Sequence, residues 1–255
     1  MVSHQVATRW AGLSTVTPTD HIAHDARQGT ALCLAVILLS WAWLLSGAGM
    51  SMGISATTTW AFPPGGETMA MPMTWTMGLA GLMLTMWSTM MWAMMLPAML
   101  LDTRRDRRSG SFSPAFVGHY MAAWIVFSVA ATALHFLADS LGWLDSMRMW
   151  SMDRGFSIAL VGIAALSQLA RWKRAHATSA HAEGNRSDRT NYALRCLCAT
   201  APVMLLLFVG GVMNLVWIVG LTVWAITQKR WSQSRWHSGM SVLICSLMII
   251  SIWDH

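Results

Sequence analysis

Six long apolar stretches separated by short polar segments run along the chain. They lie at about residues 31–53, 74–101, 115–138, 154–172, 198–226 and 238–253. A helix needs roughly 20 apolar residues to cross the hydrocarbon core of a bilayer. Helices are expected because they satisfy their own backbone hydrogen bonds in lipid. The pattern predicts an all-α, polytopic transmembrane helical bundle of about six spans, with residues 31–253 as one domain.

The last two stretches are the least regular. The fifth is interrupted by Pro202 and by the pair Gly210-Gly211. Both features bend or break helices, so a kinked or re-entrant segment is an alternative to a straight span. The sixth stretch is short for a span.

Lys and Arg residues between the stretches indicate the orientation. With a cytoplasmic N-terminus, inner segments hold twelve of them and outer segments hold five. Cytoplasmic loops of membrane proteins are enriched in these residues. Residues 1–30 are polar and lack the pattern of a removable signal peptide, so we expect a cytoplasmic tail. Three outer charges, at 227–237, do not fit this arrangement.

Composition supports a multi-pass membrane protein, which with the charge distribution above we expect in the inner (plasma) membrane. Hydrophobic residues make up 55% of the 255 positions and charged residues 11%, whereas soluble domains carry about a quarter. The net charge of +6 comes from segments that flank the spans, so lipid is the expected partner and nucleic acid is not. The four cysteines lie in or beside apolar stretches, which argues against a disulfide framework.

Methionine is unusually frequent, with 22 residues in two groups. On a helix, one face of the second stretch carries Met83, Met86, Met90 and Met94, and a neighbouring face carries Met91, Met95 and Met99. The second group lies in short segments on the expected outer side, and we call it the outer collar: Met50, Met52, Met69, Met71, Met73, Met77, Met147, Met149 and Met152.

Thioethers are soft ligands that suit Cu(I). The outer collar and the second stretch together would therefore provide a capture and transfer route for copper. Two other interpretations stay open. Methionine also fills irregular gaps in apolar cores, which favours packing for the second stretch taken alone. Exposed methionine is also easily oxidised, so an oxidant-scavenging surface is a lesser alternative for the collar.

Polar residues at membrane depth are further candidates. His135 and Asp139 are one helical turn apart, which suits either a ligand with its hydrogen-bonding partner or an interfacial salt link. Asn214 follows a glycine pair and suits either an interhelical hydrogen bond or a ligand. Cys196 and Cys198 begin the fifth stretch on the inner side, where thiolates bind Cu(I) or Zn(II). The motifs of common enzyme classes are absent.

Two runs resemble the signature spans of a bacterial family of predicted metal-binding integral membrane proteins, a domain of unknown function. They are Trp87-x-x-Met90-x-x-Ala93-Met94-Met95-x-Pro97 and Phe208-Val209-Gly210-Gly211-Val212-Met213-Asn214-Leu215-Val216-Trp217. Weaker matches are Tyr120, Trp124, Gln168, Lys173 and Lys229, and the resemblance covers about residues 75–230.

The chain departs from that family where the family carries cysteines. A cysteine pair follows the family's equivalent of Lys173, but this chain has His176 and His181 there. The family's cysteine-rich run at the fifth span is reduced to Cys196 with one clear match, and Gln228 replaces a glutamate. If cysteines hold metal in the family, this chain has shifted toward methionine and histidine.

The sequence therefore predicts a membrane protein that binds a soft metal, copper as Cu(I), for transport, delivery or assembly of a copper site. The expected partner is a metallochaperone or copper enzyme. The alternatives are a structural membrane subunit without metal and, less favoured, a membrane oxidoreductase. The predicted metal residues are Met69, Met71, Met73, Met86, Met90, Met94, Met95, Met147, Met149, Met152, Cys196, Cys198, Met213, Asn214 and His135.

Overall fold

Helices account for the regular structure of the chain where it is described. The computed structural model describes residues 18–49, 58–60, 62, 74–105, 112–145, 149–177, 189–230 and 235–254. In order, the helices are α1 (Pro18–Leu45), α3 (Met77–Arg105), α4 (Pro114–Ser140), α5 (Arg154–Ala177), α6 (Arg189–Met204), α7 (Leu207–Gly210), α8 (Leu215–Arg230) and α9 (Arg235–Asp254). The all-α prediction is confirmed.

Four segments are long and apolar enough to cross a membrane: His24–Leu45, Met77–Thr103, Pro114–Ser140 and Tyr192–Gly210. Shorter apolar helices lie at Arg154–Ala170, Leu215–Lys229 and Gly239–Trp253. Many large apolar side chains of these segments are exposed on the outside of the bundle, including Leu38, Leu39, Val126, Leu166 and Leu243. An apolar surface of this kind on spanning-length helices is what lipid chains solvate.

The first helix begins earlier than the apolar pattern predicts. It begins at Pro18, and its apolar segment at His24, although the first stretch was expected from residue 31. Proline is favoured in the first turn because its missing N–H needs no partner there. Part of the expected 1–30 tail is therefore helical, and residues 1–17 lie outside the described part of the chain.

The fifth stretch is two helical segments and not one span over 198–226. The chain runs through α6 and α7, reverses over residues 211–214, and returns as α8. Gly211 has a φ of 95°, a conformation that glycine adopts without a steric penalty. Asn214 then begins α8, because its carbonyl accepts from the Ile218 N–H at 3.0 Å and its side-chain Oδ1 accepts from the Val216 N–H at 3.1 Å.

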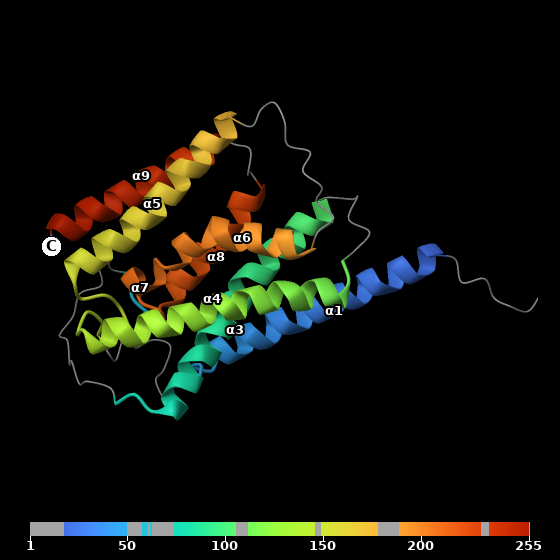
Figure 1. The fold of residues 1–255 in the computed structure, drawn as a ribbon, viewed down its shortest axis with the longest axis horizontal. Helices are drawn as coiled ribbons and strands as arrows, with labels where there is room; N and C mark the ends of the chain where they lie inside the picture. Colours follow the sequence, from blue (N-terminus) through green and yellow to red (C-terminus); the bar gives the residue numbers. More distant parts are fainter. Residues whose placement is uncertain are drawn as a thin grey trace, which may run out of the picture.

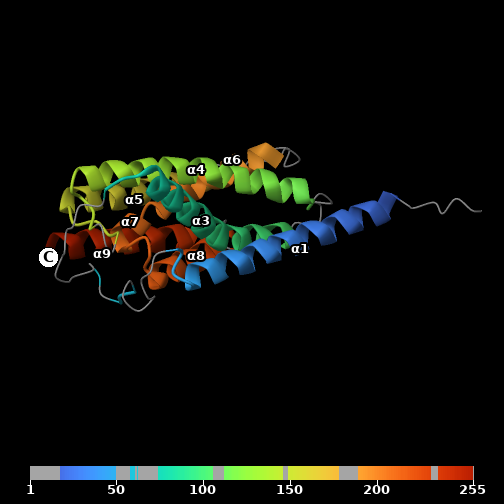
Figure 2. The same cartoon turned by 90° about the horizontal axis from the view of Figure 1, so that it is seen from below.

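The bundle is built around α3, which packs against α1, α4 and α8. On the far side α5 packs along α9, and α6 lies between this pair and α4. Figure 1 shows α5 and α9 side by side, with α6 and α8 in the middle of the molecule. Figure 2 shows that the beginning of α1 extends beyond the other helices. The end of α9 lies at the opposite end of the bundle from the beginning of α1 (Figure 1).

Hydrogen bonds and an ion pair identify which loops share each end. At one end, the turn end, the Val212 N–H donates to the Met149 carbonyl at 3.2 Å and Asn214 Nδ2 donates to the Thr59 carbonyl at 3.0 Å. At the other, the Lys229 end, Lys229 Nζ lies 3.6 Å from Asp102 Oδ2. The end of α8 therefore lies at the same end of the bundle as the end of α3. The six-span arrangement would put them at opposite ends, but the hairpin adds one more reversal of the chain.

Close packing of the hairpin gives a testable prediction. A Cβ on Gly210 would overlap the indole ring of Trp217, so Gly210→Ala is expected to lower the free energy of unfolding by about 1–3 kcal/mol. Gly220→Ala is the control, because a Cβ there has no neighbour within 4 Å. Thermal unfolding in detergent measures both. Equal stability of the two variants would contradict the approach of α8 to Gly210.

Candidate functional site

Seven methionines in the middle of α3 form a buried column, whereas Met77 at the beginning of the helix is exposed. Every one from residue 83 to residue 99 has 0% of its surface exposed: Met83, Met86, Met90, Met91, Met94, Met95 and Met99. Both predicted methionine faces are covered because α3 is surrounded by α1, α4 and α8. None of these thioethers faces lipid. We call this set the methionine column.

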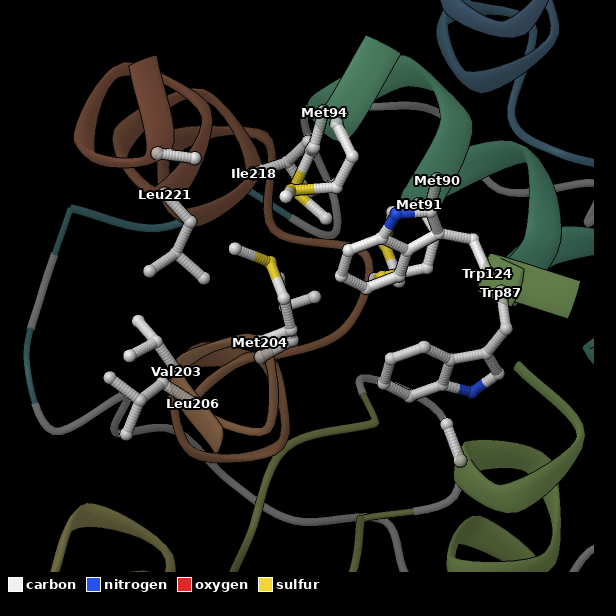
Figure 3. Packing of buried hydrophobic residues seen from close by; sticks show 14 of the residues in the cluster. Trp87, Met90, Met91, Met94, Trp124, Val203, Met204, Leu206, Ile218 and Leu221 are labelled. Carbon is white, nitrogen blue, oxygen red and sulfur yellow. The ribbon is translucent and has the colours of Figure 1, made fainter. Parts of the chain in front are cut away.

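Side chains from other helices extend the thioether surroundings of the column. Figure 3 shows Met90 and Met94 of α3 directed into the same interior as Met204 of α6. The indole rings of Trp87 and Trp124 lie beside them (Figure 3). Such an interior offers sulfur atoms but few oxygen atoms as ligands. Packing alone would also bury these residues, so burial by itself does not separate packing from metal binding.

His135 lies at the turn end of the column. Its side chain is 3% exposed, and its Nδ1 has no hydrogen-bond partner. The imidazole meets the rings of Trp75 and Phe208 at centroid distances of 5.8 Å each. Phe208 in turn lies 4.9 Å from the ring of Trp87 on α3. An aromatic chain therefore connects the imidazole to the methionine column.

Asp139 is oriented by Trp75 at the same end. The indole Nε1–H donates to Asp139 Oδ2 at 2.6 Å, a short and charge-assisted contact. The sequence predicted that His135 and Asp139 interact across one helical turn. In the structure, Trp75 contacts both of them, the carboxylate by its N–H and the imidazole by its ring.

The outer collar is only partly described. Met69, Met71, Met73 and Met147 lie outside the described residues. Met149 was expected in a solvent-facing segment, but its side chain is 1% exposed. The neighbouring Ser151 N–H donates to the Phe208 carbonyl, which holds this segment against α7. Met152 is 42% exposed. The collar residues that can be placed thus include one inside the protein and one at its surface.

Met213 and Asn214 lie in the turn between α7 and α8. Met213 is half-buried and packs against the core. Asn214 Nδ2 donates to the carbonyls of Thr59 and Gly210, and its Oδ1 accepts from Val216. These contacts match the interhelical hydrogen-bond interpretation of Asn214. Its role as a metal ligand stays a prediction.

Cys196 lies toward the other end of the column. Its Sγ is 3.1 Å from the Tyr120 hydroxyl, and that hydroxyl also contacts the Met95 carbonyl at 3.5 Å. Cys196 is 6% exposed, whereas Cys198 is exposed, because residues two apart on a helix point in different directions. The two thiols do not share one site on α6.

A polar cluster lies one helical turn before Cys196, and it was not predicted from the sequence. Tyr192 donates its hydroxyl to Asp102 Oδ2 at 2.8 Å, and Lys229 Nζ donates to the Tyr192 oxygen at 3.1 Å. Nearby on α8, Gln228 Nε2 donates to Gln168 Oε1 at 3.0 Å. Lys229 and Gln168 appeared only as family matches in the sequence. Asp102 and Tyr192 carried no signal, because their partners lie far away along the chain.

Hard-metal and zinc chemistry finds little support among the described residues. No group of three or more His, Cys, Asp or Glu side chains comes together there. The donors that do come together are thioethers, with one imidazole at one end and one thiol toward the other. Soft ligands of this kind select a soft ion such as Cu(I).

Comparison with known proteins places the chain in a family. A family model described as "PpoB2: Copper chaperone" matches residues 84–253, about two thirds of the chain. No curated protein and no solved structure matches. The match agrees with the expected metal-binding family at the level of a copper-related family. It spans the methionine column from Met86 onward, the hairpin and Lys229. The chain therefore belongs to the PpoB2 copper-chaperone family.

Proposed function

We propose that this protein binds Cu(I) as cargo inside a membrane-embedded helical bundle and delivers it to a copper-requiring protein. The observation that carries the proposal is the methionine column, which is fully buried and has His135 near one end and Cys196 near the other. At 1.5 Å per residue, Met83 to Met99 extends about 24 Å. That length approaches the roughly 30 Å hydrocarbon core of a bilayer.

The chemistry of the column favours Cu(I) over divalent ions. Divalent ions such as Mg²⁺ need oxygen ligands and retain water, which a buried thioether surface does not supply. A monovalent soft ion loses less hydration free energy on entering a dry interior, because that free energy rises with the square of the charge. Thioethers are neutral, so the bound cargo keeps its single charge, and weak neutral ligands suit transfer better than permanent storage.

The proposed route follows the order of the ligands along the bundle. Outer-collar residues, among them Met69, Met71, Met73, Met147, Met149 and Met152, would capture the ion, and Met213 with Asn214 would face it at the turn. Met86, Met90, Met94 and Met95 would pass it along α3. Cys196 would receive it toward the Lys229 end, and Cys198, on another side of α6, would serve a later step at the protein surface.

The hairpin also supports an orientation in the inner membrane. If α6–α7 and α8 each cross the bilayer, the chain spans it seven times and 227–237 lies with 102–114 and 171–195. With the N-terminus in the cytoplasm, fifteen of the 17 Lys and Arg are then inside and only Arg148 and Arg154 are outside. The six-span arrangement left five outside. The ion pair between Lys229 and Asp102 is consistent with the seven-span arrangement.

Replacing column methionines tests the function directly. The triple variant Met90→Leu, Met94→Leu, Met95→Leu preserves volume, so its folding is expected to persist. Copper retained by the purified protein under reducing conditions should fall about tenfold or more, which corresponds to ~1.4 kcal/mol of binding free energy. Met240→Leu is the control, because its side chain is exposed and belongs to neither the methionine column nor the outer collar. Equal copper in both variants would favour a structural subunit whose methionines only pack.

Separate substitutions of Cys196 and Cys198 on α6 provide a test variant and its matched control. Cys196→Ser is expected to weaken Cu(I) binding about tenfold, because it removes the buried thiol beside Tyr120 and Met95. Cys198→Ser should bind as the wild type does in a Cu(I) competition titration with the isolated protein. A stronger effect of Cys198→Ser would place the thiol ligand on the other side of α6.

Reporter fusions test the topology. A C-terminal alkaline phosphatase should be active and a C-terminal green fluorescent protein dark, because seven spans place the two termini on opposite sides of the membrane. The same reporters fused after residue 230 should give the reverse result. A fluorescent C-terminal fusion would restore the six-span arrangement.

A further inference from the structure

His135 carries a buried ring nitrogen without a hydrogen-bond partner, as do Trp87 and Trp124, but only the imidazole nitrogen has a lone pair that can bind a metal ion. His119 lies four turns earlier on the same helix, and its Nδ1 contacts the Ala115 carbonyl at 2.7 Å, one turn back. His135 makes no equivalent contact, although its Nδ1 is buried. A buried ring nitrogen without a partner is costly, and the great majority of such atoms in folded proteins are satisfied. A ligand on that nitrogen would remove the cost.

The surroundings of His135 are aromatic. Trp75 and Phe208 each meet the imidazole at 5.8 Å between ring centroids, and the geometry is edge-to-face in both cases. Phe136 also stacks on Trp75 at 5.1 Å. Aromatic faces attract cations within about 6 Å and give no oxygen ligands. Water is excluded from such a position, so an ion that must keep its hydration shell is at a disadvantage there.

One negative charge lies beside this aromatic enclosure. Asp139 is half-buried, and Trp75 Nε1 orients its carboxylate at 2.6 Å. Its negative charge favours a cation at His135. A divalent ion is at a greater disadvantage there than a monovalent one, because the cost of placing an ion in a medium of low dielectric constant rises with the square of its charge.

We propose that His135, enclosed by Trp75 and Phe208 and balanced by Asp139, is a capture site that selects monovalent soft cations, Cu(I) and its analogue Ag(I), over divalent ions. The inference rests on the proposed function and adds the selectivity step. His135 is the ligand, the two aromatic side chains exclude water and oxygen donors, and Asp139 adds negative charge that favours a cation. Phe208 contacts Trp87, so the captured ion lies next to the beginning of the methionine column.

The experiment measures Ag(I) and Zn(II) binding to the purified full-length protein in detergent. His135→Gln is expected to lower Ag(I) affinity about tenfold, whereas His119→Gln, on the same helix but exposed, should not change it. Phe208→Leu should lower the ratio of Ag(I) affinity to Zn(II) affinity about tenfold, because it opens the aromatic enclosure. Trp75→Phe should lower the same ratio by a similar factor, because it removes the hydrogen bond to Asp139. Asp139→Asn should weaken Ag(I) binding and not abolish it. Circular dichroism and gel filtration show that each variant is folded.

The outcomes separate this inference from the proposed function. Unchanged Ag(I) affinity in folded His135→Gln would overturn the capture site, as would a wild-type affinity ratio in both aromatic variants. If copper retention by the wild-type protein still depends on Met90, Met94 and Met95 in that case, the proposed function stands without this site. If the wild-type protein retains no copper at all, the proposed function fails and the site fails with it.

Discussion

Enclosure of α3 by three other helices is the constraint on which the rest of this structure depends. In lipid there is no hydrophobic force between helices, so close contact must come from side-chain shape and from a few polar contacts. Methionine is unbranched and flexible, and it adapts to the uneven surfaces that α1, α4 and α8 present. The same choice fills the centre of the bundle with sulfur. Packing and soft-ligand chemistry are thus served by one set of residues.

The polar contacts are concentrated at the two ends of this interior. Trp75, just before α3, contacts Asp139 of α4 at the turn end, and Tyr192, Asp102 and Lys229 join α6, α3 and α8 at the other. Their charges are satisfied at the ends of the helices without entering the apolar centre. The ends therefore fix the relative positions of the helices, and the centre stays free of oxygen donors.

Much of the fold was predictable from the apolar pattern, because lipid allows few alternatives to helices of spanning length. The fifth stretch was not, since a hydropathy pattern does not register the positive φ of Gly211 or the contact between Gly210 and Trp217. The candidate site was likewise predictable only in part. The column on α3 follows from residue spacing, but the contact of His135 with Trp75 and that of Tyr120 with Cys196 join residues far apart in the chain. No local pattern encodes them.

The reversal between α7 and α8 also has a consequence for how the chain is made. Its polar groups have acceptors that come from earlier segments, since Val212 donates to Met149 and Asn214 donates to Thr59. During synthesis those acceptors leave the ribosome well before the turn does. The hairpin of α6, α7 and α8 is therefore expected to insert late and as a unit, against helices that have already assembled. Membrane insertion of this protein would then proceed from the N-terminal helices to the hairpin, because the hairpin needs acceptors on the earlier segments.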